Sequence, residues 1–382
     1  MPWREVSIVS ERLEFVNLAR QIQSGSATIS MRELCERFQI SRKTAYKWLQ
    51  RSMSGLPADL QDRSRRPHRM PRQSSPQTEA AILEVRDKHP AWGGRKIRAI
   101  LMRRGSGVPS ASTITRVLER HGKLDPEQSP KHSAWQRFEY QQPNDLWQMD
   151  FKGDFETSRG RCYPLTALDD HSRYSLVLQA CGDQRTGTVQ EALTTAFRKY
   201  GLPLRILTDN GSPWGCDPER PWTVLAAWLI RLGIKIAHGR PYHPQTQGKE
   251  ERFHRTLQAE VLRRPMQDRD ECQRCFDRWR EVYNHERPHQ ALSMDVPASR
   301  YQPSARAYPE TLPPIEYAPD QIVKQVYPDG RISIEGKTIR VGRAFAGLLV
   351  SLRPTKTDGV IDVYFCHQHV YTIDLREDDG SN

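Results

Sequence analysis

Three acidic residues stand in sequence contexts that would let them bind divalent metal ions together. Asp150 ends the segment LWQMD within a predicted strand, Asp209 ends the strand segment RILTD, and Glu251 opens a helix at GKEE. Functional groups in α/β sheets gather where strands end, so acids from two strands and a helix can converge. Each acid alone also has an ordinary interpretation, because Asp is common in turns and Glu complements the dipole of a first helical turn.

A cluster of carboxylates repels itself unless cations bind to it, and Mg²⁺ prefers carboxylate, water and phosphate oxygens as ligands. Two such ions can hold the attacking and the leaving oxygen of an in-line phosphoryl displacement. The three acids therefore predict a site that processes phosphodiesters, with two Mg²⁺ ions per active site and Mn²⁺ as a substitute.

Two neighbouring glutamates compete for the helical position in this cluster. Glu250 shares a helix face with Phe253, at a spacing of three residues, and this face is predicted to be buried. Glu251 lies on the polar face, together with His254 and Arg255. We therefore expect Glu251 to be the metal ligand and His254 and Arg255 to contact phosphates, although a plain solvated face is the alternative for this pair.

Other acids near these motifs are better explained as turn residues. Asp169 and Asp170, in LDDHSRY, are predicted to form a hairpin turn between two core strands. Asp217 and Glu219 lie in a segment with flanking prolines, where acids more often form turns than bind metals.

The acids lie in a region whose pattern is that of an α/β domain. Three segments read as strands, LWQMDFKGDF, RCYPLTALDDHSRYSLVLQA and LPLRILTDN. A helical segment, TGTVQEALTTAFRKYG, separates the second from the third. Antiparallel strands followed by a helix and a further strand indicate a mixed sheet with helices on its faces.

The N-terminal region predicts a helix-turn-helix. In MRELCERFQISRKTAYKWLQR, Leu34 and Cys35 form one apolar face, Ala45 and Trp48 form the next, and Ser41 is a natural N-cap. This leaves a basic face outward at the start of the second helix, where DNA would be met. The predicted DNA-binding residues there are Arg42, Lys43, Thr44 and Lys47. An ordinary helical hairpin with a solvated charged face is the alternative.

Other segments predict a linker, a second helical unit and a C-terminal β domain. DRSRRPHRMPR reads as an extended linker in which Arg63, Arg65 and Arg66 would contact phosphates. A second, less clear helix-turn-helix follows, with Ser110 or Ser112 as its cap. Near the C-terminus, short alternating strands separated by Asp-Gly and Glu-Gly turns predict a small β-barrel.

Composition narrows the possible partners and the compartment. The formal net charge of +12 favours a polyanionic partner such as nucleic acid. The seven cysteines do not suggest a disulfide scaffold in a chain of this length, and for Cys272 and Cys275 core packing is favoured over zinc binding. The longest apolar run, TVLAAWLI, is too short to span a bilayer, and the N-terminus resembles no signal peptide. We therefore expect a cytoplasmic protein.

Four ordered motifs, WQMD, LTDNGS, HPQTQGKEERFHRTL and YNHERPHQAL, closely resemble the integrase-type catalytic core of bacterial insertion-sequence transposases. The opening MPWREVSIVSERLEFV and the arginine-rich linker are similar to the N-terminal region of one branch of this family. The resemblance implies an RNase H-like fold and Mg²⁺-dependent DNA strand transfer, with the Asp-Asp-Glu triad at Asp150, Asp209 and Glu251. It also implies double-stranded DNA, at element ends and target, as a partner, a homo-oligomer of at least two subunits on DNA, and a location at the bacterial nucleoid.

The expected fold class is multidomain α and α/β, with helix-turn-helix modules, an RNase H-like core and an SH3-like barrel. The expected domains are helix-turn-helix modules at 1–60 and 76–125, linkers at 61–75, 126–142 and 303–318, the core at 143–302 and the barrel at 319–375. Two alternative functions stay open, namely a structure-selective nuclease on the same fold and a DNA-binding regulator with an inactive core.

Overall fold

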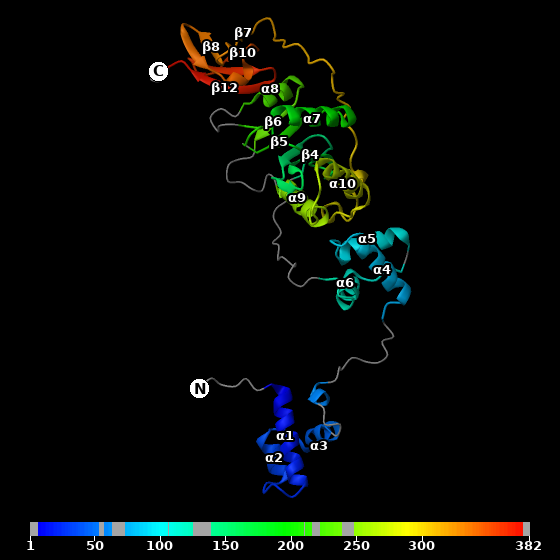
Figure 1. Ribbon diagram of the computed structural model, residues 1–382. Coiled ribbons are helices and arrows are strands. Elements are labelled where there is room, and N and C mark those ends of the chain that lie inside the picture. The colour runs from blue at the N-terminus through cyan, green and yellow to red at the C-terminus, as the bar shows by residue number, and fades with distance from the viewer. Residues whose placement is uncertain are drawn as a thin grey trace. The chain divides into compact units, whose positions relative to one another are not determined.

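The computed structural model describes residues 7–52, 57–62, 73–105, 107–124, 139–209, 211–215, 222–238 and 248–376. The chain divides into two compact units, Met1–Gln73 and Ser74–Asn382 (Figure 1). The first unit is helical, and the second contains further helices, a mixed sheet and a C-terminal β region.

The first unit confirms the predicted helix-turn-helix. Its elements are α1 (Ile8–Gln23), α2 (Met31–Arg37), α3 (Arg42–Arg51) and a short 3₁₀ turn at Pro57–Leu60. The predicted inward residues are buried in one hydrophobic cluster, which comprises Phe15, Val16, Ala19, Leu34, Cys35, Ala45, Trp48 and Leu60. The Ser41 side chain accepts a hydrogen bond from the Thr44 backbone N–H at 3.2 Å, so Ser41 caps α3 as expected.

The second unit begins with three helices, α4 (Pro76–Lys88), α5 (Gly94–Arg104) and α6 (Ala111–Arg120). Ser110, rather than Ser112, caps α6 by accepting from the Thr113 N–H at 3.2 Å. A Cβ atom at Gly94 would lie 2.5 Å from the Ala111 carbonyl oxygen, so only glycine allows α5 to cross α6 this closely.

A mixed six-stranded sheet forms the centre of the second unit. Its strands are β1 (Trp147–Phe151), β2 (Phe155–Thr157), β3 (Gly160–Asp169), β4 (Ser175–Cys181), β5 (Arg205–Thr208) and β6 (Lys235–His238). The order is β2-β3-β1-β5-β6, with β4 also paired to β3. β1, β3 and β4 are antiparallel neighbours, whereas β5 runs parallel to β1 and to β6. The predicted α/β core is confirmed.

Helices cover both faces of this sheet (Figure 1). On one face, α7 (Thr186–Tyr200) and α8 (Val224–Arg231) pack against Trp147, Met149 and other strand residues. On the other face, α9 (Gly248–Glu260) and α10 (Arg269–Glu281) pack against Leu168 and Leu178. Because side chains alternate along a strand, β1 presents Met149 to one layer and Asp150 to the opposite one. Asp150 therefore lies on the face covered by α9.

Cys272 and Cys275 are buried free thiols in the layer between α10 and the sheet. Their packing in the core agrees with the interpretation favoured from the sequence. None of the helices described in the structure is long and apolar enough to cross a membrane.

The C-terminal region differs from the predicted barrel. Its strands are β7 (Ile322–Gln325), β8 (Arg331–Ile334), β9 (Lys337–Arg340), β10 (Leu349–Pro354), β11 (Val360–Phe365) and β12 (Gln368–Asp374). They form a four-stranded sheet, β12-β11-β10-β7, and a separate β8-β9 hairpin, and the described strands do not close into a barrel. The predicted Glu-Gly turn is present, with positive φ at Glu335 and Gly336. The hairpin and the four-stranded sheet bury one shared apolar cluster, which Ala227 and Ile230 of α8 join.

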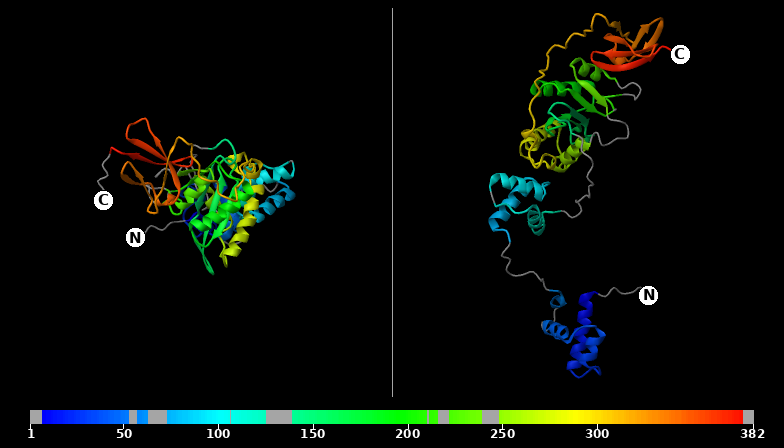
Figure 2. Two further views of the ribbon diagram at one scale, coloured as in Figure 1. Left: turned by 90° about the horizontal axis from the view of Figure 1, so that it is seen from above. Right: turned by 180° about the vertical axis from the view of Figure 1, so that it is seen from behind.

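The proline-rich segment expected as a linker runs along the core as an ordered strap, seen from two sides in Figure 2. We use the name strap for residues 303–318. The Arg306 guanidinium donates to the carbonyl oxygens of Pro203 at 2.5 Å, Leu232 at 3.0 Å and Gly233 at 2.9 Å. The strap therefore satisfies backbone carbonyls at the C-terminal end of α8 that would otherwise lack partners.

Candidate active site

Two of the predicted acids are brought side by side by the parallel pairing of β1 with β5. In this pairing Trp147 lies opposite Ile206 and Gln148 lies opposite Leu207. Continued by two residues, the same register sets Asp150 level with Asp209, which directly follows β5. Residues in register on neighbouring parallel strands point to the same face, so the two carboxylates share one edge of the sheet.

The third acid stands in the first turn of α9, the helix that packs against β1 and β3. Glu251 is exposed, whereas Glu250 is 1% exposed and shares its buried face with Phe253 and Leu257. The helical-face prediction for the two glutamates is therefore confirmed. Burial, followed by the charge of Asp150, raises the pKa of Glu250 well above its ordinary value and so favours the neutral form of this carboxyl.

The electrostatics of Asp150 link the three acids. Burial, and then the negative charges of Asp209 and Glu251, raise the pKa of Asp150 to about 7. Within the described part of the chain, no three His, Cys, Asp or Glu side chains gather closely enough to form a preassembled metal site. The carboxylate oxygens of Asp150, Asp209 and Glu251 fit a hard divalent cation, because such an ion relieves the repulsion between these acids that contributes to the raised pKa of Asp150. The triad itself stays a prediction.

The pKa of Asp150 predicts that the metal-free chain loses stability as the pH rises. An unfolded Asp ionises near pH 4, about three units below the folded value of about 7. Ionisation between these values therefore favours the unfolded chain, and the stabilising effect of the neutral form is fully present only below about pH 4. Asp150→Asn removes the ionisable group, and with it this loss of stability at high pH. We expect the melting temperature of Asp150→Asn to exceed that of the natural chain by several degrees at about pH 8, measured in chelator.

The advantage of Asp150→Asn should shrink as the pH falls toward about 4 and vanish below it, where the natural Asp is neutral in both states. The exposed Asp358 offers a control, because Asp358→Asn removes one negative charge without relieving burial. Equal melting temperatures for Asp150→Asn and the natural chain at both pH values would show that the pKa of Asp150 is not raised in the folded chain.

His254 does not lie on the open face with Glu251 and Arg255, which corrects its expected position. Its side chain is 13% exposed, and its Nε2 atom lies 2.8 Å from the Thr166 hydroxyl. Burial lowers the pKa of His254 to about 4, so the ring is neutral and cannot pair with a phosphate as a cation near neutral pH. Arg255 is exposed, as predicted.

Asp169 and Asp170 lie at the turn between β3 and β4, as predicted, and both are completely buried. The Asp169 carboxylate accepts from the backbone N–H groups of Asn144 and Ser172, each at 2.7 Å. Asp170 forms an ion pair with Lys249, two residues before Glu251. Asp169 and Asp170 therefore hold neighbouring parts of the core together. Asp217 and Glu219 lie outside the described residues.

The YNHERPH element braces the core. The Asn284 side chain pairs with both backbone groups of Ser175, accepting at 2.8 Å and donating at 3.0 Å. Arg287 Nε donates to Glu260 Oε1 at 3.1 Å, with both side chains about nine-tenths buried. Trp279 Nε1 donates to the other oxygen of Glu260 at 2.8 Å. The Arg287 side chain therefore helps to hold the ends of α9 and α10 together.

The predicted DNA-binding face of α3 is largely open. Arg42, Lys43 and Lys47 are exposed, whereas Thr44 is half-buried, with its hydroxyl 3.0 Å from that of Ser41. The sequence did not single out Tyr46, which is 56% exposed between these basic residues. Arg63, Arg65 and Arg66 lie outside the described residues.

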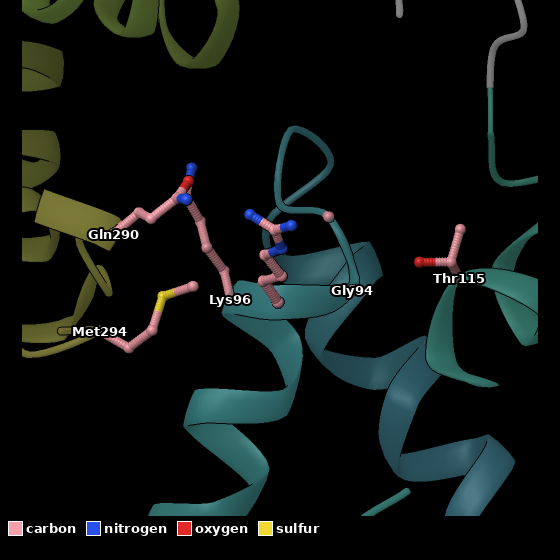
Figure 3. Close-up of a pocket in the computed structure, with 7 residues that line it drawn as sticks. Gly94, Lys96, Thr115, Gln290 and Met294 are labelled. Carbon is pink, nitrogen blue, oxygen red and sulfur yellow. The ribbon is translucent and has the colours of Figure 1, made fainter. Parts of the chain in front are cut away.

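A pocket of about 260 Å³ lies where the α4–α6 helices meet the segment after α10 (Figure 3). Its lining includes Arg95, Lys96, Thr115, Gln290 and Met294. None of the three predicted acids lines it, so this pocket is separate from the candidate active site. It marks a contact at which Arg103 donates to the Met294 carbonyl oxygen at 2.7 Å.

Family comparisons define the class of the core. Residues 140–244 and 232–297 match Integrase core domain families, residues 321–380 match the C-terminal domain of the IS481 family transposases, and residues 44–118 match a Homeodomain-like domain. The resemblance to insertion-sequence transposases with an integrase-type core is confirmed.

Individual relatives include proteins of two insertion elements and of a retrovirus. An uncharacterized protein of insertion element IS476 from Xanthomonas euvesicatoria is 26% identical over 227 residues, which are 57% of this chain and 63% of that protein. One from insertion element IS407 of Burkholderia multivorans is 23% identical, over 57% of this chain and 78% of that protein. The Gag-Pro-Pol polyprotein of Simian retrovirus SRV-2 is 34% identical over 30% of this chain and 6% of its own length. The chain thus spans less than two thirds of the IS476 protein.

Two solved structures are also similar. One is a simian T-cell lymphotropic virus intasome in complex with a PP2A regulatory subunit, with a TM-score of 0.35 and 16% identity, covering 76% of this chain and 99% of that one. The other is the HTLV-2 integrase catalytic core domain in complex with magnesium, with a TM-score of 0.31 and 15% identity, covering 42% of this chain and 97% of that one.

Proposed function

We propose that this chain is a DNA transposase that frees the 3′ ends of an insertion sequence and joins them to target DNA. The observation that carries this proposal is the parallel register of β1 with β5, whose continuation by two residues would set Asp150 level with Asp209, next to the packing of α9, which bears Glu251, against β1. These three carboxylates would hold two Mg²⁺ ions, with Mn²⁺ as a substitute. When bound, the ions supply charge neutralisation at the reacting phosphate and activate the attacking hydroxyl.

Other residues of the chain would bind and orient DNA. Arg42, Lys43 and Lys47 extend from α3, the helix that a helix-turn-helix places in the major groove, and would contact a terminal repeat of the element. Arg255 is exposed four residues after Glu251, one helical turn along α9, and would contact a phosphate near the reacting bond. Arg63, Arg65 and Arg66 would add phosphate contacts from the linker. The protein would act at the bacterial nucleoid.

The reaction also implies an assembly of subunits. Each chain contributes one set of Asp150, Asp209 and Glu251, whereas an element has two ends that must be cut and joined together. We therefore propose a homo-oligomer of at least two subunits on DNA. A symmetric dimer would present two sites to the two element ends.

A strand-transfer assay tests this function. The full chain is incubated with labelled duplex DNA carrying the element end, unlabelled plasmid as target, and Mg²⁺. We expect labelled plasmid, formed through joining of the 3′ hydroxyl, and none in chelator. A scrambled end sequence is the matched control, because non-specific binding depends on phosphates alone and would not distinguish the two DNAs.

The other outcomes separate the alternative functions. Hydrolysis of the labelled DNA without joined product would identify a nuclease on the same fold. Specific binding of the end sequence without either product, at any concentration of Mg²⁺ or Mn²⁺, would identify a DNA-binding regulator with an inactive core.

A further inference from the structure

The buried carboxylate of Asp170 connects the two elements that bear the outer members of the triad. Asp170 is 0% exposed. Its Oδ1 atom accepts from Gln148 Nε2 at 2.7 Å and pairs with Lys249 Nζ, while Oδ2 accepts from the Tyr140 N–H at 2.8 Å. Gln148 belongs to β1 and Lys249 to α9, so a single carboxylate joins the strand to the helix.

Gln148 and Lys249, the two residues that Asp170 joins, lie close in sequence to the proposed metal ligands. Gln148 stands two residues before Asp150, and alternation along β1 places both on the same face. Lys249 stands two residues before Glu251, within the first turn of α9. First turns fray easily, because their N–H groups lack intrahelical partners. A fixed anchor at Lys249 therefore constrains where Glu251 lies relative to Asp150.

A second link lies beside the first. Thr166 is paired in register with Asp150, and its hydroxyl lies 2.9 Å from the Asp150 carbonyl oxygen. The same hydroxyl lies 3.0 Å from Glu250 Oε2 and 2.8 Å from His254 Nε2. α9 is thus held to the β1–β3 pair at Thr166, through residues on either side of Glu251, and at Asp170 through its first turn.

We propose that Lys249 is a positioning residue whose ion pair with Asp170 sets the spacing of Asp150 and Glu251, and thereby the affinity of the site for divalent cations. This inference rests on the proposed function. The Lys249 side chain is 18% exposed, so most of it is committed to the core rather than to solvent or DNA. Loss of its charge would release the start of α9 and leave Asp170 buried without its cation.

Calorimetric titration of the full chain with Mn²⁺, without DNA, tests this role. We expect Lys249→Met to weaken Mn²⁺ binding about tenfold, the scale seen when groups that orient metal ligands are removed. Lys249→Arg keeps a cation at this position and should retain affinity within about threefold. Arg306→Ala is the matched control, because it destabilises the second unit at the strap, away from the acids, and should leave Mn²⁺ affinity unchanged.

If Lys249→Met fails to fold, the double variant Asp170→Asn, Lys249→Met removes both charges and leaves no unpaired buried ion. It should fold and still bind Mn²⁺ about tenfold more weakly than the natural chain. Affinity equal to that of the natural chain in either folded variant would overturn the positioning role alone. No Mn²⁺ binding by the natural chain would overturn both the positioning role and the metal chemistry of the proposed function.

Discussion

Glu251→Gln is expected to lower strand transfer by about a thousandfold or more, because a bound metal ion supplies several kcal/mol of transition-state stabilisation. The amide of Gln is a weaker ligand without charge. Glu251 is exposed, so the change should leave the melting temperature nearly unaltered. Joined product from labelled end DNA, measured at saturating Mg²⁺, gives the effect directly.

Glu250→Gln is the matched control, since it makes the same chemical change one residue earlier. Glu250 is 1% exposed, burial raises its pKa and so favours its neutral form, and Gln has nearly the shape of a neutral Glu. The contact with Thr166 can therefore persist, and we expect partial retention of activity. Equal losses in Glu251→Gln and Glu250→Gln would contradict the assignment of the two glutamates.

Arg287→Ala is expected to cause a large loss of stability, because it breaks a buried ion pair. The change would leave Glu260 about nine-tenths buried without the guanidinium 3.1 Å away. Removal of one partner from a buried ion pair typically costs about 3–5 kcal/mol. We therefore expect the melting temperature to fall by about 10 °C, measured by circular dichroism.

A second arginine–glutamate pair provides the comparison. Arg198 donates to both oxygens of Glu310, at 2.9 Å and 2.7 Å, but both side chains are more than half exposed. Because solvent screens exposed pairs, Arg198→Ala should leave the melting temperature nearly unchanged. A similar fall in both variants would mean that burial does not determine the strength of these pairs.

Local patterns in the sequence were sufficient for much of the fold. Ser41 predicted the start of α3, and the segment LWQMDFKGDF predicted the strand that carries Asp150. Helical spacing separated Glu250 from Glu251, because a three-residue repeat with Phe253 defines one buried face. Each of these inferences depends on contacts within one element, which neighbouring residues determine.

Other features depend on partners that are distant in sequence. His254 was assigned to the open face from spacing alone, but Thr166 on β3 draws its ring inward. The link from Asp170 to Lys249 spans 79 residues and has no local pattern, although a lysine directly before two acids is a weak signal. Prolines in the strap suggested a loose linker, whereas Arg306 fixes the strap to carbonyl groups that only the folded core brings together.

The C-terminal strands show the same limit. Alternation and turn residues predicted short strands correctly, yet they could not show which strands pair or whether the sheet closes. Closure depends on what covers the apolar side. Here the β8–β9 hairpin and the four-stranded sheet share one buried cluster with Ala227 and Ile230 of α8, and these contacts join residues far apart in the sequence.

α8 is shared between two hydrophobic clusters. Leu225, Trp228 and Leu229 pack toward the mixed sheet, while Ala227 and Ile230 pack toward the C-terminal strands. An exchange of the C-terminal strands with those of another mobile element would therefore succeed only if the incoming surface matched this helix. We therefore expect changes at the faces of α8 and of the C-terminal strands to compensate each other, so that the two regions are inherited together rather than as independent cassettes.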